Sequence, residues 1–114
     1  MNADRPATYS PETSIVEAPP EGEVRRVQHG DTYVLLARVE GNTYAVADSC
    51  THGKASLSQG YLDGWEIECP LHQGRFDIRT GRATASPCRH PLAVFMVKEH
   101  EGTVQIFDTK SNDN

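Results

Sequence analysis

The chain has 114 residues, of which 37% are hydrophobic and 24% charged, and its formal net charge is -5. This length suits one domain, because a core of this size can bury about two thirds of the unfolded surface. The acidic balance argues against nucleic acid or an anionic membrane as a partner, since both attract basic surfaces. No apolar run approaches the roughly 18 residues that span a bilayer, and the N-terminus lacks a signal-peptide pattern, so we expect a cytoplasmic protein.

The first 22 residues differ in composition from the rest. Four of the seven prolines lie among the Ser, Thr, Glu and Ala residues of this segment, which is typical of a flexible, extended lead-in. From residue 23 onward, short runs rich in Val, Tyr and Thr alternate with turn residues. We therefore expect a flexible extension over residues 1–22, a domain over residues 23–110 and a short tail over residues 111–114.

The early part of the domain is predicted to form three strands, EVRRVQ, TYVLLARV and TYAVA. Gly41 and Asn42 lie between the second and third and suit a tight hairpin turn, because both residues tolerate positive φ.

The later part of the domain is predicted to form two hairpins. FDIRTGRAT turns at Thr80–Gly81, and LAVFMVKE pairs with TVQIF through residues 100–102. No window sustains a helical period. The sequence therefore predicts an all-β fold, in which early and late strands form an antiparallel sandwich or barrel base and residues 48–91 form a smaller inserted lobe.

Two cysteine–histidine couples, Cys50-Thr-His52 and Cys69-Pro-Leu-His72, are the strongest chemical feature of the chain. Each couple follows a predicted strand, so two loops can hold one object between them. A Cys2His2 zinc site is compatible with these four donors, although common zinc motifs pair like ligands within one turn. If each loop straddles a two-metal centre instead, both cysteines reach one metal and both histidines the other, which is Rieske-type ligation.

The motifs CTHG, LSQGYLDG, ECPLHQGRFDIRTG and ASPCRHPL carry a family resemblance. Through these motifs, the stretch from residue 23 to residue 107 resembles the small Rieske ferredoxins of multicomponent aromatic-ring-hydroxylating oxygenases. The resemblance implies a Rieske fold with one 2Fe-2S cluster. It also implies that Cys50 and Cys69 ligate the buried iron, and that His52 and His72 ligate the outer iron.

The residues beside the ligands imply a low reduction potential. High-potential Rieske proteins carry two further cysteines that form a disulfide. At the positions that resemble these cysteines, this chain has Ala55 and Leu71. They also carry a serine and a tyrosine whose hydroxyls donate hydrogen bonds to the cluster sulfurs, where this chain has Gly74 and Phe76. We therefore expect a potential at the low end of the Rieske range, about -150 mV.

The resemblance implies a monomeric one-electron carrier between a flavin-dependent ferredoxin reductase, fed by NAD(P)H, and a terminal Rieske oxygenase. No further His/Asp cluster follows His72 to hold a catalytic mononuclear iron, so we expect an electron-transfer component and not an enzyme. Two alternatives remain open at this point. One is a Rieske-like small subunit of an assimilatory nitrite reductase, and the other is a structural zinc module.

Other residues have less specific interpretations. The basic side chains near the second couple fit a docking patch and a solvated strand face equally well; they are Arg75, Arg79, Arg82 and Arg89. Cys88 is expected to be a partly buried free thiol. Trp65 and Tyr61 are expected to pack, and the histidines outside the couples are expected to be solvated; these are His29, His90 and His100.

Overall fold

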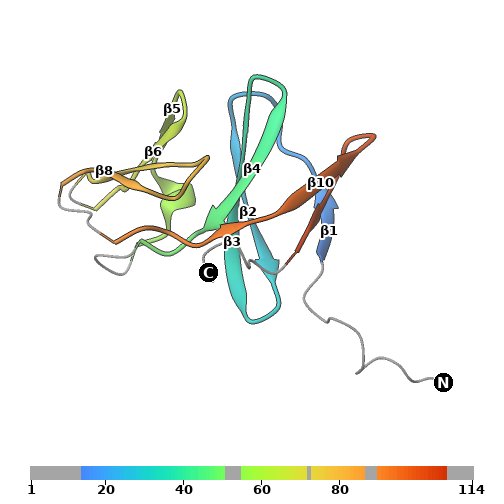
Figure 1. The fold of residues 1–114 in the computed structure, drawn as a ribbon, viewed down its shortest axis with the longest axis horizontal. Coiled ribbons are helices and arrows are strands. Elements are labelled where there is room, and N and C mark those ends of the chain that lie inside the picture. The colour runs from blue at the N-terminus through green and yellow to red at the C-terminus, as the bar shows by residue number, and fades with distance from the viewer. Residues whose placement is uncertain (1–13, 51–54, 72, 87–89, 108–114) are drawn as a thin grey trace.

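The computed structural model describes residues 14–50, 55–71, 73–86 and 90–107 (Figure 1). The described strands are β1 (Ser14–Glu17), β2 (Val24–His29), β3 (Thr32–Val39), β4 (Asn42–Ala47), β5 (Tyr61–Asp63), β6 (Glu66–Glu68), β7 (Arg75–Asp77), β8 (Ala83–Ala85), β9 (Val94–Phe95), β10 (Val97–His100) and β11 (Thr103–Ile106), with one 3₁₀ turn, η1 (Leu57–Gln59). Among the described residues, no helix has the length and hydropathy to cross a membrane. The prediction of an all-β fold is confirmed.

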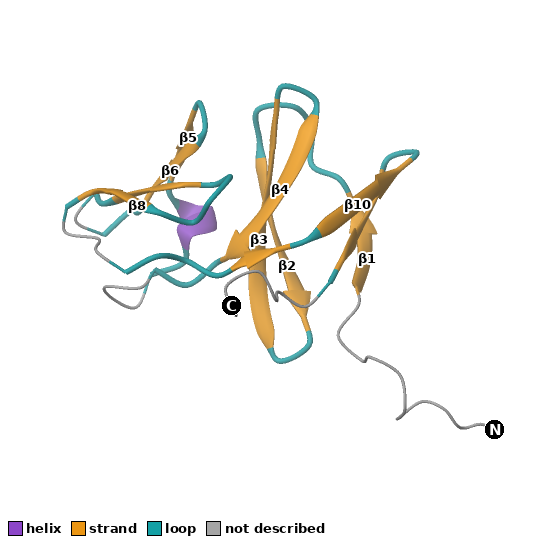
Figure 2. Cartoon of the chain, in the orientation of Figure 1, coloured by secondary structure: helices purple, strands orange, loops and turns teal. Residues whose placement is uncertain are grey.

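The strands form three antiparallel sheets (Figure 2). Their orders are β1-β11-β10, β2-β3-β4-β9 and β5-β6-β7-β8. We call the first two the base and the third the lobe. In Figure 1 the sheet of β2, β3 and β4 lies between β1 and β10 on one side and the lobe on the other.

Strand β3 is covered on both faces by this arrangement. Val34 and Leu36 pack in a cluster with β11, whereas Leu35 and Ala37 pack in a second cluster with the lobe. All four side chains are fully buried. A strand covered on both faces reads as a continuous apolar run instead of an alternating one, which explains the sequence VLLA.

One continuous core joins the base to the lobe. Its buried members are Leu35, Ala37, Val39, Val46, Cys50, Leu57, Ile67, Cys69, Phe76, Ile78 and Leu92. The lobe strands are only three residues long, so their sheet has little apolar surface of its own to bury. The lobe is therefore stabilised by packing against the base.

The hairpin between β3 and β4 turns one residue earlier than predicted. Its turn residues are Glu40 (φ 53°) and Gly41 (φ 81°), whereas Asn42 begins β4. The Glu21 carboxylate accepts hydrogen bonds from the backbone N–H groups of both turn residues, at 2.7 and 2.9 Å. This long-range contact helps to stabilise Glu40 in a left-handed conformation that the local sequence alone does not favour.

The late apolar run LAVFMVKE, predicted as one strand, divides between two sheets. Its first part is β9, which pairs with β4, and its second part is β10, which pairs with β11. Met96 lies at the division. The hairpin that follows turns at Glu101 and Gly102, which both have positive φ, within the predicted residues 100–102.

Strand β1 differs from the prediction of a flexible extension over residues 1–22. Ser14–Glu17 pairs with β11, and the hydroxyl of Ser14 lies 2.8 Å from Nδ1 of His29. His29 is 2% exposed, so its predicted solvation is wrong. The proline-rich composition concealed this short strand because its partner lies about 90 residues further along the chain.

Candidate metal centre

The two cysteines of the predicted site enter it from separate strands. Cys50 follows β4 by three residues, and Cys69 comes directly after β6. Both predicted strand ends are therefore confirmed for the cysteines. The two histidines of the couples, His52 and His72, lie outside the described residues, as do Cys88 and Arg89.

The structure brings the two thiols together at the edge of the shared core. Cys50 is 5% exposed and Cys69 is fully buried. A side-chain hydrogen bond joins them. Burial raises the pKa of the Cys69 thiol to about 11, the Leu71 N–H opposes this shift, and the neighbouring Cys50 adds to it.

The second ligand loop, from Cys69 to Gly74, joins β6 to β7. The N–H of Cys69 donates to the carbonyl of Gly74 at 2.7 Å, and the N–H of Leu71 donates to the sulfur of Cys69 at 3.4 Å. Gln73 has a φ of 63°, a conformation that non-glycine residues adopt at a cost and that is common at functional sites. The loop thus directs a backbone donor at one sulfur.

The first ligand loop, residues 50–55, lies between β4 and η1. The N–H of Cys50 donates to the carbonyl of Ala55 at 3.0 Å, and Ser49 and Ser56 form an isolated antiparallel bridge. These contacts close the loop at its neck.

Gly60 lets the chain after the first loop approach the second. A Cβ built at Gly60 would lie 1.8 Å from the carbonyl oxygen of Glu68, the residue before Cys69. No real side chain tolerates this distance, so only glycine fits here. The end of η1 can therefore pack directly on the strand that presents the second cysteine.

Apolar side chains pack around the two cysteines. Phe76 is fully buried in the same cluster as the two thiols, and Ala55 packs against that cluster. Leu71, in contrast, is 39% exposed, although its N–H reaches a cysteine sulfur. Apolar side chains and one backbone donor, the Leu71 N–H, surround the described half of the site.

This donor set fits an iron–sulfur or other soft-metal group. Two buried thiols from different loops lie in contact, and one of them already accepts a backbone hydrogen bond. Thiolates are soft ligands, and an apolar shell with N–H donors is what tunes such centres.

Two of the basic side chains of the lobe, Arg75 and Arg79, are paired with carboxylates. Arg75 lies within 3.2 Å of Asp63, Glu66 and Glu68, and these hydrogen bonds raise its pKa, with that from Glu66 the largest cause. Arg79 binds Asp77 at 3.0 Å. These two arginines therefore do not form a purely basic docking surface.

The remaining candidates have mixed outcomes. Trp65 packs against the core, as predicted, and its ring lies 4.6 Å beneath the Arg79 guanidinium. Tyr61 is 68% exposed, so its predicted packing is wrong. His90 and His100 are exposed, as predicted.

The polar residue that the sequence interpretation missed is Asp48. Its carboxylate is nearly buried and binds Ser56, Ser58 and Arg26. The available signal was weak, namely an aspartate before the first couple and two serines after it.

The Rieske [2Fe-2S] domain model matches residues 11–100. The chain belongs to this family. The match begins before residue 23, in agreement with the position of β1 in the base sheet. The family implies a 2Fe-2S cluster, which fits the two thiols of the site.

Two Rieske relatives indicate the kind of protein. The ferredoxin component of the naphthalene 1,2-dioxygenase/salicylate 5-hydroxylase systems of Ralstonia sp is 48% identical over 69% of this chain and 76% of its own length. The biphenyl dioxygenase ferredoxin subunit of Pseudomonas sp. (strain KKS102) is 42% identical over 80% of this chain and 84% of its own.

A solved structure agrees with the relatives. The chain matches one chain of a complex of reduced oxygenase and oxidized ferredoxin in carbazole 1,9a-dioxygenase. The TM-score is 0.82 and the identity 44%, over 86% of this chain and 95% of that one. The predicted resemblance to Rieske ferredoxins is confirmed.

Proposed function

We propose that the chain is a Rieske ferredoxin that carries single electrons from an NAD(P)H-dependent flavin reductase to the terminal oxygenase of an aromatic-ring-hydroxylating dioxygenase system. The observation that carries the proposal is the contact between Cys50 and Cys69, each of which begins a cysteine–histidine couple in a chain of the Rieske family. Relatives that resemble this chain over most of their length are ferredoxin components of such systems.

We assign one 2Fe-2S cluster to the four residues of the couples. Cys50 and Cys69 would hold one iron, and His52 and His72 the other. When bound, such a cluster accepts and returns one electron at a time.

The described residues support that role by their surroundings. Phe76 and Ile67 keep water from the cysteines, since both are fully buried beside them. The N–H of Leu71 stabilises negative charge on the sulfur of Cys69. The exposed side chain of Leu71, the residue before His72 in the sequence, offers an apolar surface where a partner would meet the chain in a small interface.

We infer that the chain is an electron-transfer component without a catalytic iron of its own. The two histidines that follow His72 in the sequence are His90 and His100, and neither stands in a His/Asp cluster of the kind that holds a mononuclear oxygenase iron. We further infer that the carrier works in the cytoplasm, because its reductase draws on NAD(P)H. We propose a lobe over residues 48–91, and a base that includes β1 and ends near residue 110.

The ligand assignment is tested by replacing each histidine. His52→Ala and His72→Ala should each abolish the Rieske-type EPR and visible spectrum, whereas His100→Ala, at the exposed end of β10, should leave it intact. A Rieske spectrum that survives in either ligand variant would exclude the assignment. A colourless protein with stoichiometric zinc would show a structural zinc module instead.

The carrier role is tested by reconstitution. The purified chain should restore electron flow between a matched reductase and oxygenase in a dose-dependent manner. On gel filtration of native extract, the chain should elute near 12.6 kDa. Elution within a stable larger reductase complex would favour the nitrite reductase subunit.

A further inference from the structure

The two ligand loops are closed by different kinds of contact. The second loop connects β6 to β7, which pair with each other in register, so the strand ladder holds its two ends. The first loop connects β4 to η1, and no ladder joins these elements. Its neck has the isolated bridge of Ser49 with Ser56 and the hydrogen bond from Cys50 to Ala55. The position of Cys50 therefore needs support beyond sheet pairing.

Asp48 supplies contacts across this neck. Its side chain is 4% exposed, and its carboxylate accepts hydrogen bonds from the Ser56 hydroxyl at 2.5 Å and from the Ser58 N–H at 2.8 Å. Both serines lie after the loop, whereas Asp48 lies before it. The main-chain carbonyl of Asp48 also accepts the Leu57 N–H at 2.7 Å. One residue thus joins the two ends of the first ligand loop.

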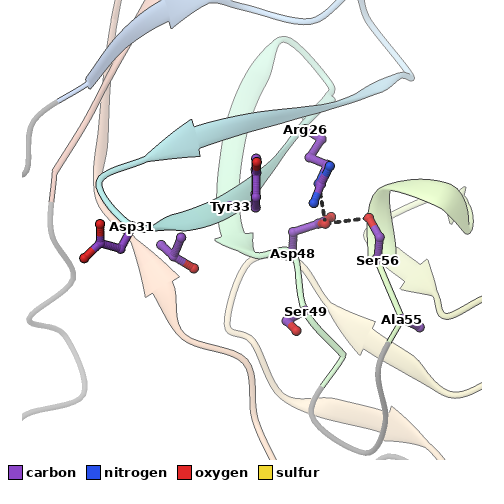
Figure 3. A pocket seen from close by; sticks show the side chains of 8 residues that line it. Arg26, Asp31, Tyr33, Asp48, Ser49, Ala55 and Ser56 are labelled. Atoms are coloured by element: carbon purple, nitrogen blue, oxygen red, sulfur yellow. Dashed lines mark hydrogen bonds and ion pairs between the residues drawn. The ribbon is translucent and has the colours of Figure 1, made fainter.

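The same carboxylate connects the loop to the base. Arg26, on β2, donates to Asp48 at 3.2 Å, and its guanidinium lies 3.7 Å from the ring centre of Tyr33, on β3 (Figure 3). The N–H of Asp48 donates to the Tyr33 carbonyl at 3.1 Å. Two base strands therefore fix Asp48 two residues before Cys50.

A carboxylate suits this position for a physical reason. It only accepts hydrogen bonds and has about four lone-pair sites, so it can accept three donors from two separate segments, β2 and the stretch around η1. A buried carboxylate is costly unless donors surround it, and here a hydroxyl, an N–H and a guanidinium do so.

We propose that Asp48 is the positioning residue of the first ligand loop. Through Ser56 and Ser58 it holds Cys50 in place relative to Cys69, and its negative charge beside the centre disfavours an added electron. The inference rests on the proposed cluster site.

The test uses the complete, cluster-loaded chain with Asp48→Asn, which keeps the size of the side chain but removes its charge. Iron release to a chelator should be about tenfold faster than in the wild type, since a charge-assisted network is lost. The reduction potential should rise, because a negative charge near the centre is removed. The reduction potential and the rate of iron release are measured independently of the thermal unfolding midpoint.

Asp77→Asn is the matched control. The Asp77 carboxylate also binds a backbone N–H and an arginine side chain, both of Arg79, but at the turn between β7 and β8. This variant should lose some stability yet release iron at the wild-type rate with an unchanged potential. If Asp48→Asn matches this control in both release rate and potential, the inference is wrong.

Ser56→Ala keeps the inference testable if Asp48→Asn does not fold. It removes one donor to Asp48 and leaves Arg26 paired, so iron release should again be faster, by a smaller factor. Where both variants fold, their combined effect should be less than additive, because they break one contact. The inference would be overturned if Ser56→Ala released iron at the wild-type rate. It would also be overturned if the effects of the two substitutions on iron release were additive. A wild-type chain without any 2Fe-2S cluster would instead refute the proposed function.

Discussion

Phe76 and Leu71 contribute to the metal centre in different ways. Phe76 is fully buried beside the two cysteines, and its ring has no hydroxyl to donate. Leu71 contributes its main-chain N–H, 3.4 Å from the sulfur of Cys69, while its side chain stays half exposed. The apolar identity of position 76 was readable in the sequence. The role of the Leu71 N–H as a donor could not be predicted from the sequence, because every residue except proline has a main-chain N–H.

Phe76→Tyr tests the expectation of a low potential. A hydroxyl that reaches a cluster sulfur favours the reduced state, so the potential should rise by tens of mV, since about 1 kcal/mol corresponds to about 43 mV for one electron. Protein-film voltammetry measures the shift. Tyr61→Phe, which removes an exposed hydroxyl elsewhere in the lobe, should leave the potential unchanged. An unchanged potential in Phe76→Tyr with an intact EPR spectrum would show that position 76 does not face a sulfur.

The lowered pKa of Asp77 predicts how the stability of the fold depends on pH. Hydrogen bonds from the Arg79 side chain lower the pKa of Asp77 from its ordinary 3.8. Because the pKa of Asp77 is lower in the folded than in the unfolded chain, its ionised carboxylate stabilises the fold above about pH 4. This contribution is lost as the pH falls through the pKa of the folded state. Asp77→Asn should therefore cost about 1 kcal/mol at pH 7 and progressively less toward pH 3, in urea unfolding at stepped pH. A cost that does not change with pH would contradict this interpretation.

At the scale of elements, β1 and the late strands show where local pattern is insufficient. The pattern of β1 is only four residues long, and Ser14–Glu17 becomes a strand because β11 offers an open edge. The run from β9 to β10 changes sheets at Met96, which the apolar pattern does not mark. By contrast, β3 was predicted with correct bounds, because four of its 8 residues are Thr, Tyr or Val, which are enriched in strands, and turn residues flank the run.

Two neighbouring substitutions test whether β1 is a structural part of the base. Val16 packs against the core cluster of β3 and β11, whereas Ile15 is 69% exposed on the opposite face. Val16→Ala should lower the free energy of unfolding by about 1 kcal/mol, and Ile15→Ala by less than about 0.5 kcal/mol. Denaturant unfolding measures both. Equal effects of the two substitutions would mean that β1 does not pack as described.

At the scale of the whole molecule, the lobe and the base share one core. Residues from β3 and β4 and residues from the lobe lie in the same buried cluster as the two cysteines. The cysteines thus form part of the contact between the two parts. Loss of lobe packing should disturb the metal centre and the base together, since neither part encloses a separate core around these residues.

Ile67→Ala tests this shared core. The side chain lies fully buried in the lobe sheet, so its truncation should cost about 2–4 kcal/mol. Far-UV circular dichroism of the strands and visible absorbance of the cluster should then fall in one transition, shifted to lower temperature in both signals. A cluster transition that moves while the strand signal stays in place would show that the lobe unfolds alone.

The sequence by itself determined the kinds of ligand and their order, the all-β class and the lack of hydroxyls near the second couple, because residue identity and short-range periodicity encode these features. Only the tertiary structure decided that Cys50 meets Cys69, that β1 joins the base and that Arg26 pairs with Asp48. Each of these is a contact between segments distant in the chain. Such contacts depend on how apolar faces pack, which no local pattern records.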